Sequence, residues 1–330
     1  MKSDLKNLFI VGTPLQLLNA IEAAKQFKLE NNILIVVHRS LEANKVQIET
    51  LKSLYDWEKI IDIEYSRHSS IFKYINLVKY LKKHSYKYIF ISKLEVVPKI
   101  VIPNVTKENV FLLDDGALTI KIYEEHIKTN KINKYNFREL RFLFFGLKIK
   151  IRDKINLFTY FDLEPVNDIL VIKNNLTFLK ESYLKNAKKD NDIIYFVGQP
   201  IYDTIGIDSY IKNLEKLIKS SNKKVVYIPH RGEKKDFLLL LSSLNNPLLT
   251  ILEIGMPIEM YFLQNGIYPS RIISYYSTAL TTLDIIYDDC EINPIRVPDS
   301  FFSHNKILSK ALNVFYKHFD ESKIILYDKI

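Results

Sequence analysis

Short apolar runs alternate with longer amphipathic stretches along the first third of the chain. The runs consist of Val, Ile, Leu and Phe without interruption, which is typical of strands buried on both faces of a parallel sheet. The stretches between them have helical spacing, so we expect helices that cover the sheet. The predicted strands are 8–12, 32–37, 59–63, 86–91 and 110–113, and the predicted helices are 14–24, 41–55 and 71–83.

The same alternation resumes near residue 192 and predicts a second Rossmann-like half. We therefore expect an α/β protein with two Rossmann-like domains, residues 1–155 and 156–330, which face a central cleft. This is the arrangement of GT-B nucleotide-sugar glycosyltransferases. The predicted strands of the second half are 192–198, 225–229, 248–252 and 271–274, and the predicted helices are 208–220, 234–243, 256–264 and 305–319.

The segment 121–161 has a different pattern, in which Lys and Arg alternate with Phe, Leu and Ile. One interpretation is an element that binds the acceptor or lies on a membrane surface. The other is a helical region between the domains whose cationic side chains lie along apolar surface. The pattern alone leaves both open.

Composition narrows the class of protein. With 330 residues, 47% hydrophobic and 26% charged, the chain reads as globular rather than disordered. A single cysteine excludes an intramolecular disulfide, and no apolar run approaches 18 residues, so we expect a cytoplasmic protein. The net charge of +9 favours anionic partners, but no RNA-binding or helix-turn-helix signature appears, so nucleic acid is not expected.

Several common catalytic motifs are absent. Gly12-Thr13-Pro14 follows the first strand without a dinucleotide-binding fingerprint, and no Walker motif is present. Neither a zinc-binding histidine pair nor a Gly-x-Ser-x-Gly elbow appears. We therefore expect neither a metal nor a cofactor.

The candidate chemistry lies where predicted strands end, because the carboxyl ends of strands bind ligands in open α/β sheets. Pro229-His230-Arg231 places an imidazole beside a guanidinium, although a loop histidine without function is the simpler alternative. Asp114-Asp115-Gly116 offers two carboxylates that could act as a base, with a plain Asp-Gly turn as the alternative.

Further candidates follow other strands of the second half. Asp203 comes shortly after Gly198-Gln199-Pro200, and Asp208 is expected to cap the next helix. Ser277 and Thr278 precede a helix that starts at Ala279, where hydroxyls and free N–H groups bind phosphate or simply cap the helix. Glu259 could accept hydrogen bonds from a ribose, or lie solvated on its helix.

Taken together and in order, these motifs resemble glycosyltransferase family 52, the bacterial lipooligosaccharide α-2,3-sialyltransferases. The resemblance covers most of the chain, and the shared order and spacing make it specific. It is carried by residues 13–16, 91–95, 114–116, 198–200, 228–231, 257–259 and 275–280.

The resemblance implies inverting, metal-independent transfer of sialic acid from CMP-sialic acid to a terminal galactose. It also implies roles in catalysis and in donor binding. His230 would be the acid that assists the leaving phosphate, and Asp203 would be the base, with Asp115 or Asp114 as runner-up. Gly198, Gln199, Pro200, Arg231, Glu259, Ser277 and Thr278 would bind the donor.

On the acceptor side we expect Thr13, Gln16, Asp114 and Gly116. The expected partners are CMP-sialic acid, a galactose-terminated glycan, the inner face of the bacterial inner membrane as a peripheral site, and a second copy in a homodimer. Arg231 stands where the family usually has proline. Two alternatives stay open, a family-52 glucosyltransferase that uses a UDP-hexose and a basic nucleotide-binding module without catalysis.

Overall fold

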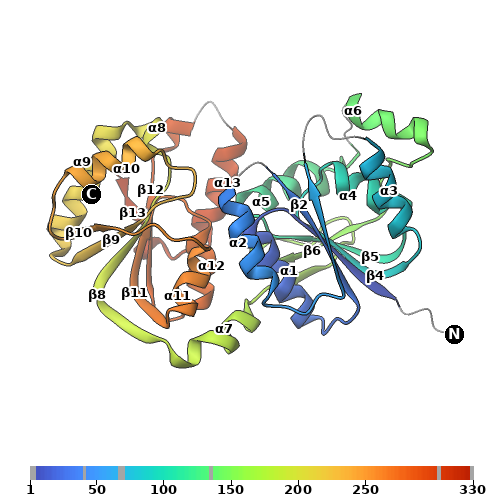
Figure 1. Ribbon diagram of the computed structural model, residues 1–330. Helices are drawn as coiled ribbons and strands as arrows, with labels where there is room; N and C mark the ends of the chain where they lie inside the picture. The colour runs from blue at the N-terminus through green and yellow to red at the C-terminus, as the bar shows by residue number, and fades with distance from the viewer. Residues whose placement is uncertain (1–4, 40–41, 66–70, 134–136, 303–305, 328–330) are drawn as a thin grey trace. The chain divides into compact units, whose positions relative to one another are not determined.

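The computed structural model describes residues 5–39, 42–65, 71–133, 137–302 and 306–327, and divides the chain into two compact units (Figure 1). Unit 1 is Met1–Phe178 and unit 2 is Leu179–Ile330. Each unit is built around its own sheet, and every strand pair in both sheets is parallel.

The sheet of unit 1 has the strand order β3-β2-β1-β4-β5-β6-β7. Its first strands are buried throughout because both faces are covered, as the continuous apolar runs predicted. The bounds are β1 Lys6–Val11, β2 Asn32–His38, β3 Lys59–Glu64, β4 Ser85–Ile91, β5 Thr106–Leu113, β6 Ile155–Thr159 and β7 Val171–Lys173.

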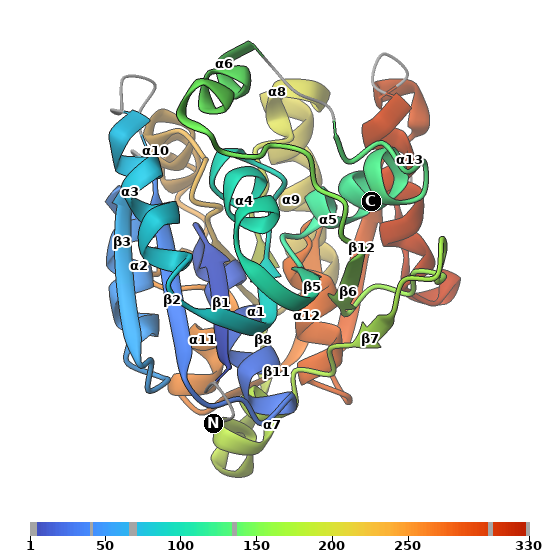
Figure 2. The same ribbon diagram turned by 90° about the vertical axis from the view of Figure 1, so that its right-hand side faces the viewer.

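Helices cover this sheet on both sides. Figures 1 and 2 show α1 and α2 on one face and α3 and α4 on the other. Thr13 is the N-cap of α1, where its hydroxyl accepts a hydrogen bond from Gln16 N–H, and Pro14 is the first helical residue, as predicted. The helices are α1 Pro14–Gln26, α2 Glu42–Lys52, α3 Ile71–Leu81, α4 Val96–Val101, α5 Ala117–Ile122 and α6 Phe137–Leu140.

Unit 1 extends beyond the domain boundary expected near residue 155. β6 pairs with β5, and β7 pairs with β6, so both strands belong to the first sheet. The division between the two compact units falls after Phe178, whose N–H donates to Glu22 of α1 at 3.1 Å. The last residues of unit 1 are therefore tied to its first helix.

The basic, aromatic segment 121–161 is only partly helical. It contains a π-helix at Tyr123–Ile127, the short α6, and a 3₁₀ helix, η3, at Arg141–Phe145. It then runs without regular structure into β6. The end of this segment is a buried strand of the first sheet, so it is not simply a helical connection between domains.

The sheet of unit 2 has the order β10-β9-β8-β11-β12-β13. In order of appearance this is 3-2-1-4-5-6, and the first six strands of unit 1 follow the same order, which is that of the Rossmann fold. The bounds are β8 Lys188–Val197, β9 Lys224–Ile228, β10 Leu249–Ile251, β11 Ile267–Ser274, β12 Glu291–Arg296 and β13 Ile325–Leu326.

The predicted helices of unit 2 lie close to their expected positions, with one correction at Asp208, and the structure adds the short α7 and α8, which the sequence did not predict. Gly206, with a φ of 87°, is the N-cap of α9, and the helix begins at Ile207. Asp208 is therefore inside the first turn, where its charge favours the helix dipole, and does not cap the helix. Helix α7, Thr177–Tyr183, spans the division between the units. The helices that follow it are α8 Tyr202–Ile205, α9 Ile207–Ser221, α10 Lys235–Ser243, α11 Ile258–Gln264, α12 Ala279–Ile286 and α13 Lys306–Lys317.

Within the part of the chain that the structure describes, no helix combines the length and the apolar character that a membrane span requires.

Candidate functional site

In unit 2 the candidate residues gather at the carboxyl ends of β8, β9 and β11. β8 lies between the other two strands, so the strand order reverses beside it, which is where open α/β sheets bind ligands. Two hydrogen bonds hold the strand ends together. Gly198 N–H donates to Ile228 O at 2.8 Å, and the Ser274 hydroxyl donates to Val197 O at 2.6 Å.

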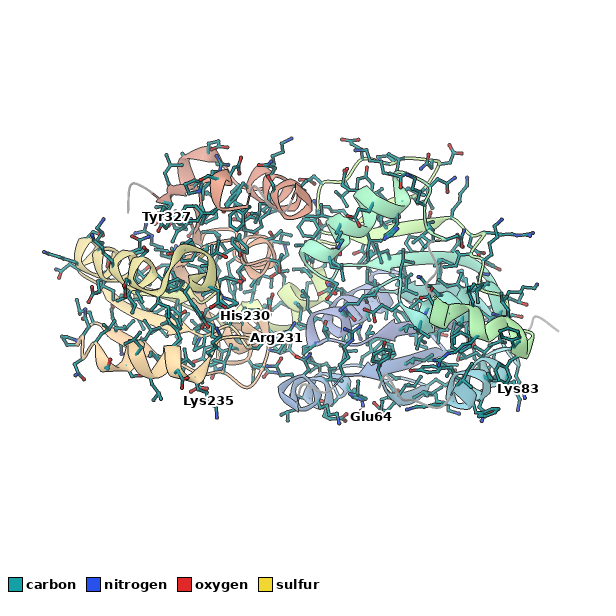
Figure 3. The ribbon with its side chains drawn as sticks, turned by 90° about the horizontal axis from the view of Figure 1, so that it is seen from above. Glu64, Lys83, His230, Arg231, Lys235 and Tyr327 are labelled. Atoms are coloured by element: carbon teal, nitrogen blue, oxygen red, sulfur yellow. The ribbon has the colours of Figure 1, made fainter. Side chains whose placement is uncertain are left out.

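His230 follows β9 and is held by its own loop. Its Nδ1 accepts a hydrogen bond from Gly232 N–H at 3.1 Å, and its backbone N–H donates to Glu233 Oε2 at 3.2 Å. Burial and the neighbouring Arg231 lower the pKa of the imidazole. The ring is therefore neutral at pH 7, with its proton on Nε2. Figure 3 shows His230 and Arg231 side by side.

Glu233 is the residue of this site that the sequence reading missed. Its carboxyl group accepts a hydrogen bond from the Tyr227 hydroxyl at 2.7 Å, and that hydroxyl lies 2.8 Å from the hydroxyl of Tyr210. Burial raises the pKa of Glu233 to about 7. Its position three residues after His230, the spacing of a tight turn, was the available signal.

Gly198 makes a close approach in this site. A Cβ at this position would lie 2.7 Å from the Tyr227 hydroxyl and 2.8 Å from Glu233 Oε2. The end of β8 therefore packs directly against the buried Tyr227 and the half-buried Glu233 that it contacts. Gln199 and Pro200, the next two predicted donor-binding residues, are half-buried in the loop that follows.

Asp203 reaches the same loop from α8. It pairs with Lys234, the neighbour of Glu233, at 3.0 Å, and its side chain is 59% exposed. Tyr202 supports this contact, because its hydroxyl accepts a hydrogen bond from Lys234 N–H at 3.1 Å. Asp203, the predicted base, thus lies near the loop of His230, but its carboxylate is already paired with the ammonium group of Lys234.

Ser277 and Thr278 precede α12 as predicted. Thr278 is the N-cap without a side-chain hydrogen bond, and the Ser277 hydroxyl accepts one from Ala279 N–H at 3.3 Å. Glu259, in the first turn of α11, is buried and accepts a hydrogen bond from Thr282 of α12 at 2.5 Å. Burial raises its pKa. Glu259 thus joins two helices, which the sequence did not indicate.

In unit 1 the Asp-Asp-Gly segment splits into different roles. Asp114 is fully buried, and its carboxyl group accepts hydrogen bonds from the Thr159 hydroxyl at 2.8 Å and from Tyr160 N–H at 2.7 Å. Burial raises its pKa to about 7. Gly116 has a φ of 60° and starts α5, so a side chain would strain this turn. Asp114 therefore links β5 to β6 and does not face an acceptor.

Asp115 is the carboxylate of this segment that meets other candidate residues. It pairs with Lys93, which follows β4, at 3.1 Å, and accepts a hydrogen bond from the Thr13 hydroxyl at 3.4 Å. β1, β4 and β5 thus each contribute one of these residues at their carboxyl ends. Lys93 lies in the segment 91–95, one of those that carry the family resemblance, but the sequence indicated no role for it.

Gln16 lines a pocket next to this cluster. Its Oε1 accepts a hydrogen bond from Gly12 N–H at 2.7 Å, while its buried Nε2 has no partner among the described residues. The pocket is small, with a volume of about 30 Å³. Its other polar and aromatic residues are Arg39, Tyr65, Lys93 and Glu95.

One group of side chains in unit 1 has the composition of a cation site. His38, Glu49 and Asp62 bring their ligand atoms within 4.8 Å of one another. However, the Lys52 ammonium lies 2.7 Å from both carboxylates, and His38 Nε2 is 2.5 Å from Asp62. The lysine already supplies the positive charge, so the group is an ion-pair network.

Comparison with known proteins identifies the architecture. No protein-family model and no curated protein matches the sequence. Among solved structures, the UDP-GlcNAc 2-epimerase of Methanocaldococcus jannaschii superposes with a TM-score of 0.55 at 14% identity, covering 98% of this chain and 90% of that one. The UDP-GlcNAc 2-epimerase of Neisseria meningitidis, bound to UDP-GlcNAc, gives 0.53 at 13% identity, covering 97% and 95%.

The chain has the two-domain GT-B α/β fold. At this level of identity the likeness shows the fold alone. Within the GT-B fold, the cluster in unit 2 and the cluster in unit 1 each lie at the ligand-binding edge of a Rossmann-like sheet.

Proposed function

We propose that the chain is a glycosyltransferase that binds a nucleotide-sugar donor at the carboxyl edge of the unit 2 sheet. The observation that carries this proposal is the position of His230, which is half-buried just after β9, with Gly232 N–H donating to its Nδ1 so that Nε2 carries the proton of the neutral ring. The Nε2–H of this ring can donate a hydrogen bond to a phosphate oxygen of a leaving nucleotide and so stabilise the negative charge that develops there. The structurally similar UDP-GlcNAc 2-epimerases, solved in complex with UDP-GlcNAc, support a nucleotide sugar as ligand.

The finer proposal is that the donor is CMP-sialic acid and the acceptor a terminal galactose, joined by an α-2,3 linkage. It is supported by the ordered motifs that resemble glycosyltransferase family 52. The bond between the sugar and the phosphate breaks through an oxocarbenium-like state, and the acceptor oxygen attacks from the opposite face. Arg231, His230 and the start of α12 supply donors for the phosphate.

Two carboxylates can take the acceptor proton in this scheme. Asp115 is mostly buried beside Lys93 and Thr13, whereas Asp203 is exposed and paired with Lys234. Asp114 is committed to Thr159 and Tyr160 and is left out. Asp115→Asn and Asp203→Asn separate the two, because only loss of the base lowers turnover by about 10²-fold or more.

The test is an assay of CMP release from CMP-sialic acid in the presence of a galactosyl acceptor. We expect His230→Ala to lower turnover by about 10²-fold or more with an unchanged circular dichroism spectrum. His84→Ala, which changes a histidine of unit 1 that meets Tyr80 edge-on, is the matched control.

Other outcomes would redirect the proposal. Turnover of a UDP-hexose but not of CMP-sialic acid would sink the donor assignment and favour a UDP-sugar enzyme. Binding of nucleotides without turnover of any donor would favour the non-catalytic module. Near wild-type turnover of His230→Ala would remove His230 from the mechanism.

A further inference from the structure

A group of large apolar side chains is exposed on unit 1, on two segments far apart in the sequence. Phe144 is 89% exposed and Phe72 60%, and their apolar neighbours are between 39% and 51% exposed. Large contiguous apolar patches on a soluble protein mark interaction surfaces. This apolar patch consists of Phe72, Leu140, Leu143, Phe144 and Phe145.

The two segments are held together by one buried and one outer ring contact. Phe142 of η3 is buried and meets Tyr74 of α3 edge-on, with ring centroids 6.1 Å apart. On the outside, Phe145 meets Phe72 in the same manner at 5.7 Å. Because Phe142 anchors η3 to α3, the residues that follow it are directed outward. The patch is therefore a built surface rather than a loose loop.

Three cations follow the patch directly. In residues 147–152 the odd positions are buried and the even positions, Lys148, Lys150 and Arg152, are exposed. None of these three makes an ion pair with any residue that the structure describes. An apolar surface with adjoining unpaired cations fits the boundary between acyl chains and anionic headgroups.

The patch lies at the ligand-binding edge of the unit 1 sheet. Phe72 is in the first turn of α3, and this helix follows the carboxyl end of β3 in a parallel sheet. Lys93 and Asp115 lie at the same edge, after β4 and β5. Figures 1 and 2 agree that α6 lies beyond the start of α3 at this edge.

We propose that unit 1 binds peripherally to an anionic lipid bilayer through the apolar patch and the adjoining Lys148, Lys150 and Arg152. A second copy of the chain fits the surface less well. In a twofold interface the patch would face itself, and the cations of both copies would be brought together. Binding to a bilayer would present the Lys93–Asp115 edge to a lipid-linked acceptor, and only this last consequence rests on the proposed glycosyl transfer.

The test is flotation of the full chain with vesicles of phosphatidylcholine alone or mixed equally with phosphatidylglycerol. We expect binding to the mixed vesicles that weakens as salt is raised. The double variant Phe144→Ser with Phe145→Ser should bind at least tenfold more weakly, since two exposed rings no longer enter the bilayer. Leu239→Ser, which removes a leucine that is 68% exposed on α10 of unit 2, is the control and should bind as wild type.

A second pair of variants separates local charge from net charge. Changing Lys148, Lys150 and Arg152 to Glu should abolish the preference for phosphatidylglycerol. Changing Lys79, Lys82 and Lys83 to Glu alters the net charge equally but lies at the far end of α3, so binding should be largely kept. Equal loss in both triple variants would overturn the proposal in favour of unspecific charge attraction.

Two further results would also overturn it. One is wild-type protein that does not float with either vesicle. The other is a dimer in light scattering that Phe144→Ser with Phe145→Ser dissociates, because the patch would then be covered by a second copy. Neither result bears on CMP release with a soluble acceptor, so this proposal and the proposed function fail separately.

Discussion

At the scale of single residues, two carboxyl groups, one fully buried and one half-buried, have strongly raised pKa values. Asp114 in unit 1 and Glu233 in unit 2 have pKa values raised to about 7 by burial. Each folded unit therefore holds a proton that the unfolded chain, with a carboxyl pKa near 4, would release. Stability from these groups is fully present below about pH 4 and is lost as the pH rises through about 7.

We predict that Asp114→Asn removes part of this pH dependence. Asparagine keeps an oxygen that can accept a hydrogen bond from Thr159 or Tyr160, but it cannot ionise. The free energy of unfolding of the wild type should fall relative to that of the variant between about pH 4 and 7, by at most about 1.4 kcal/mol per pH unit. Urea titrations at several pH values measure the difference.

The matched control for this prediction is Asp168→Asn. Asp168 is 91% exposed and pairs only with Lys154, at 3.4 Å. Its replacement should leave the pH dependence of stability as in the wild type. If both variants follow the wild-type curve, Asp114 does not carry the buried proton.

The sequence singled out polar residues that the structure places together at strand ends, but not the side chains that hold them. His230, Asp115 and Gly198 were singled out because polar residues at strand ends are visible from periodicity. The roles of Glu233 and Asp114 were not visible, because they depend on Tyr227 and Thr159, which meet them only in the folded sheet. Burial of a carboxyl group cannot be deduced from the residues next to it in the chain.

At the scale of elements, the contact between the ends of β8 and β9 is the tightest part of unit 2. Gly198 leaves no room for a Cβ, because the Tyr227 hydroxyl is fixed between Tyr210 and Glu233. Both tyrosines are fully buried. A side chain at residue 198 therefore has to displace a rigid ring or break the hydrogen bonds that position Glu233.

We predict that Gly198→Ala destabilises the protein by about 1–3 kcal/mol, the usual penalty for overpacking. It should also disturb nucleotide binding, because the loop of His230 rests on Glu233. Thermal unfolding and nucleotide titration measure the two effects. Gly255→Ala is the control, since nothing lies within 4 Å of a Cβ there. Equal melting temperatures for the two variants would contradict the prediction.

The elements that the sequence did not reveal are short or irregular. β6 and β7 have five and three residues, and residues 146–154 before them form no regular structure. In residues 146–154 apolar side chains alternate with cations, a pattern that also fits a helix lying on a membrane surface. Longer elements were predicted to within a few residues because their hydrophobic period extends over several turns or strands.

At the scale of the whole molecule, the two units carry complete and separate sheets. The last residues of unit 1 bind back to its first helix. The Asn174 side chain donates to Asn19 of α1 at 3.0 Å, and Phe178 N–H donates to Glu22. The GT-B fold followed from the two alternating series of strands and helices. The boundary between the units could not be placed, because β6 and β7 escaped recognition.

We predict that a fragment of residues 1–178 unfolds cooperatively, whereas a fragment of residues 1–155 does not. The shorter fragment lacks Thr159, which donates a hydrogen bond to the buried Asp114, and almost all of β6, the strand that pairs with β5. An unsatisfied buried carboxyl group costs on the order of several kcal/mol. Urea unfolding followed by circular dichroism distinguishes the two. A cooperative transition in the shorter fragment would show that β6 and β7 are dispensable.

The closure of unit 1 by Asn174 and Phe178 also has a consequence for synthesis on the ribosome. All strands of the first sheet lie within unit 1, so the sheet can fold while unit 2 is still being translated. At about 5–20 residues per second, the following roughly 150 residues take on the order of ten seconds. During that interval unit 1 is a folded nascent domain, and its exposed Phe144 and neighbouring cations are available before unit 2 has been made.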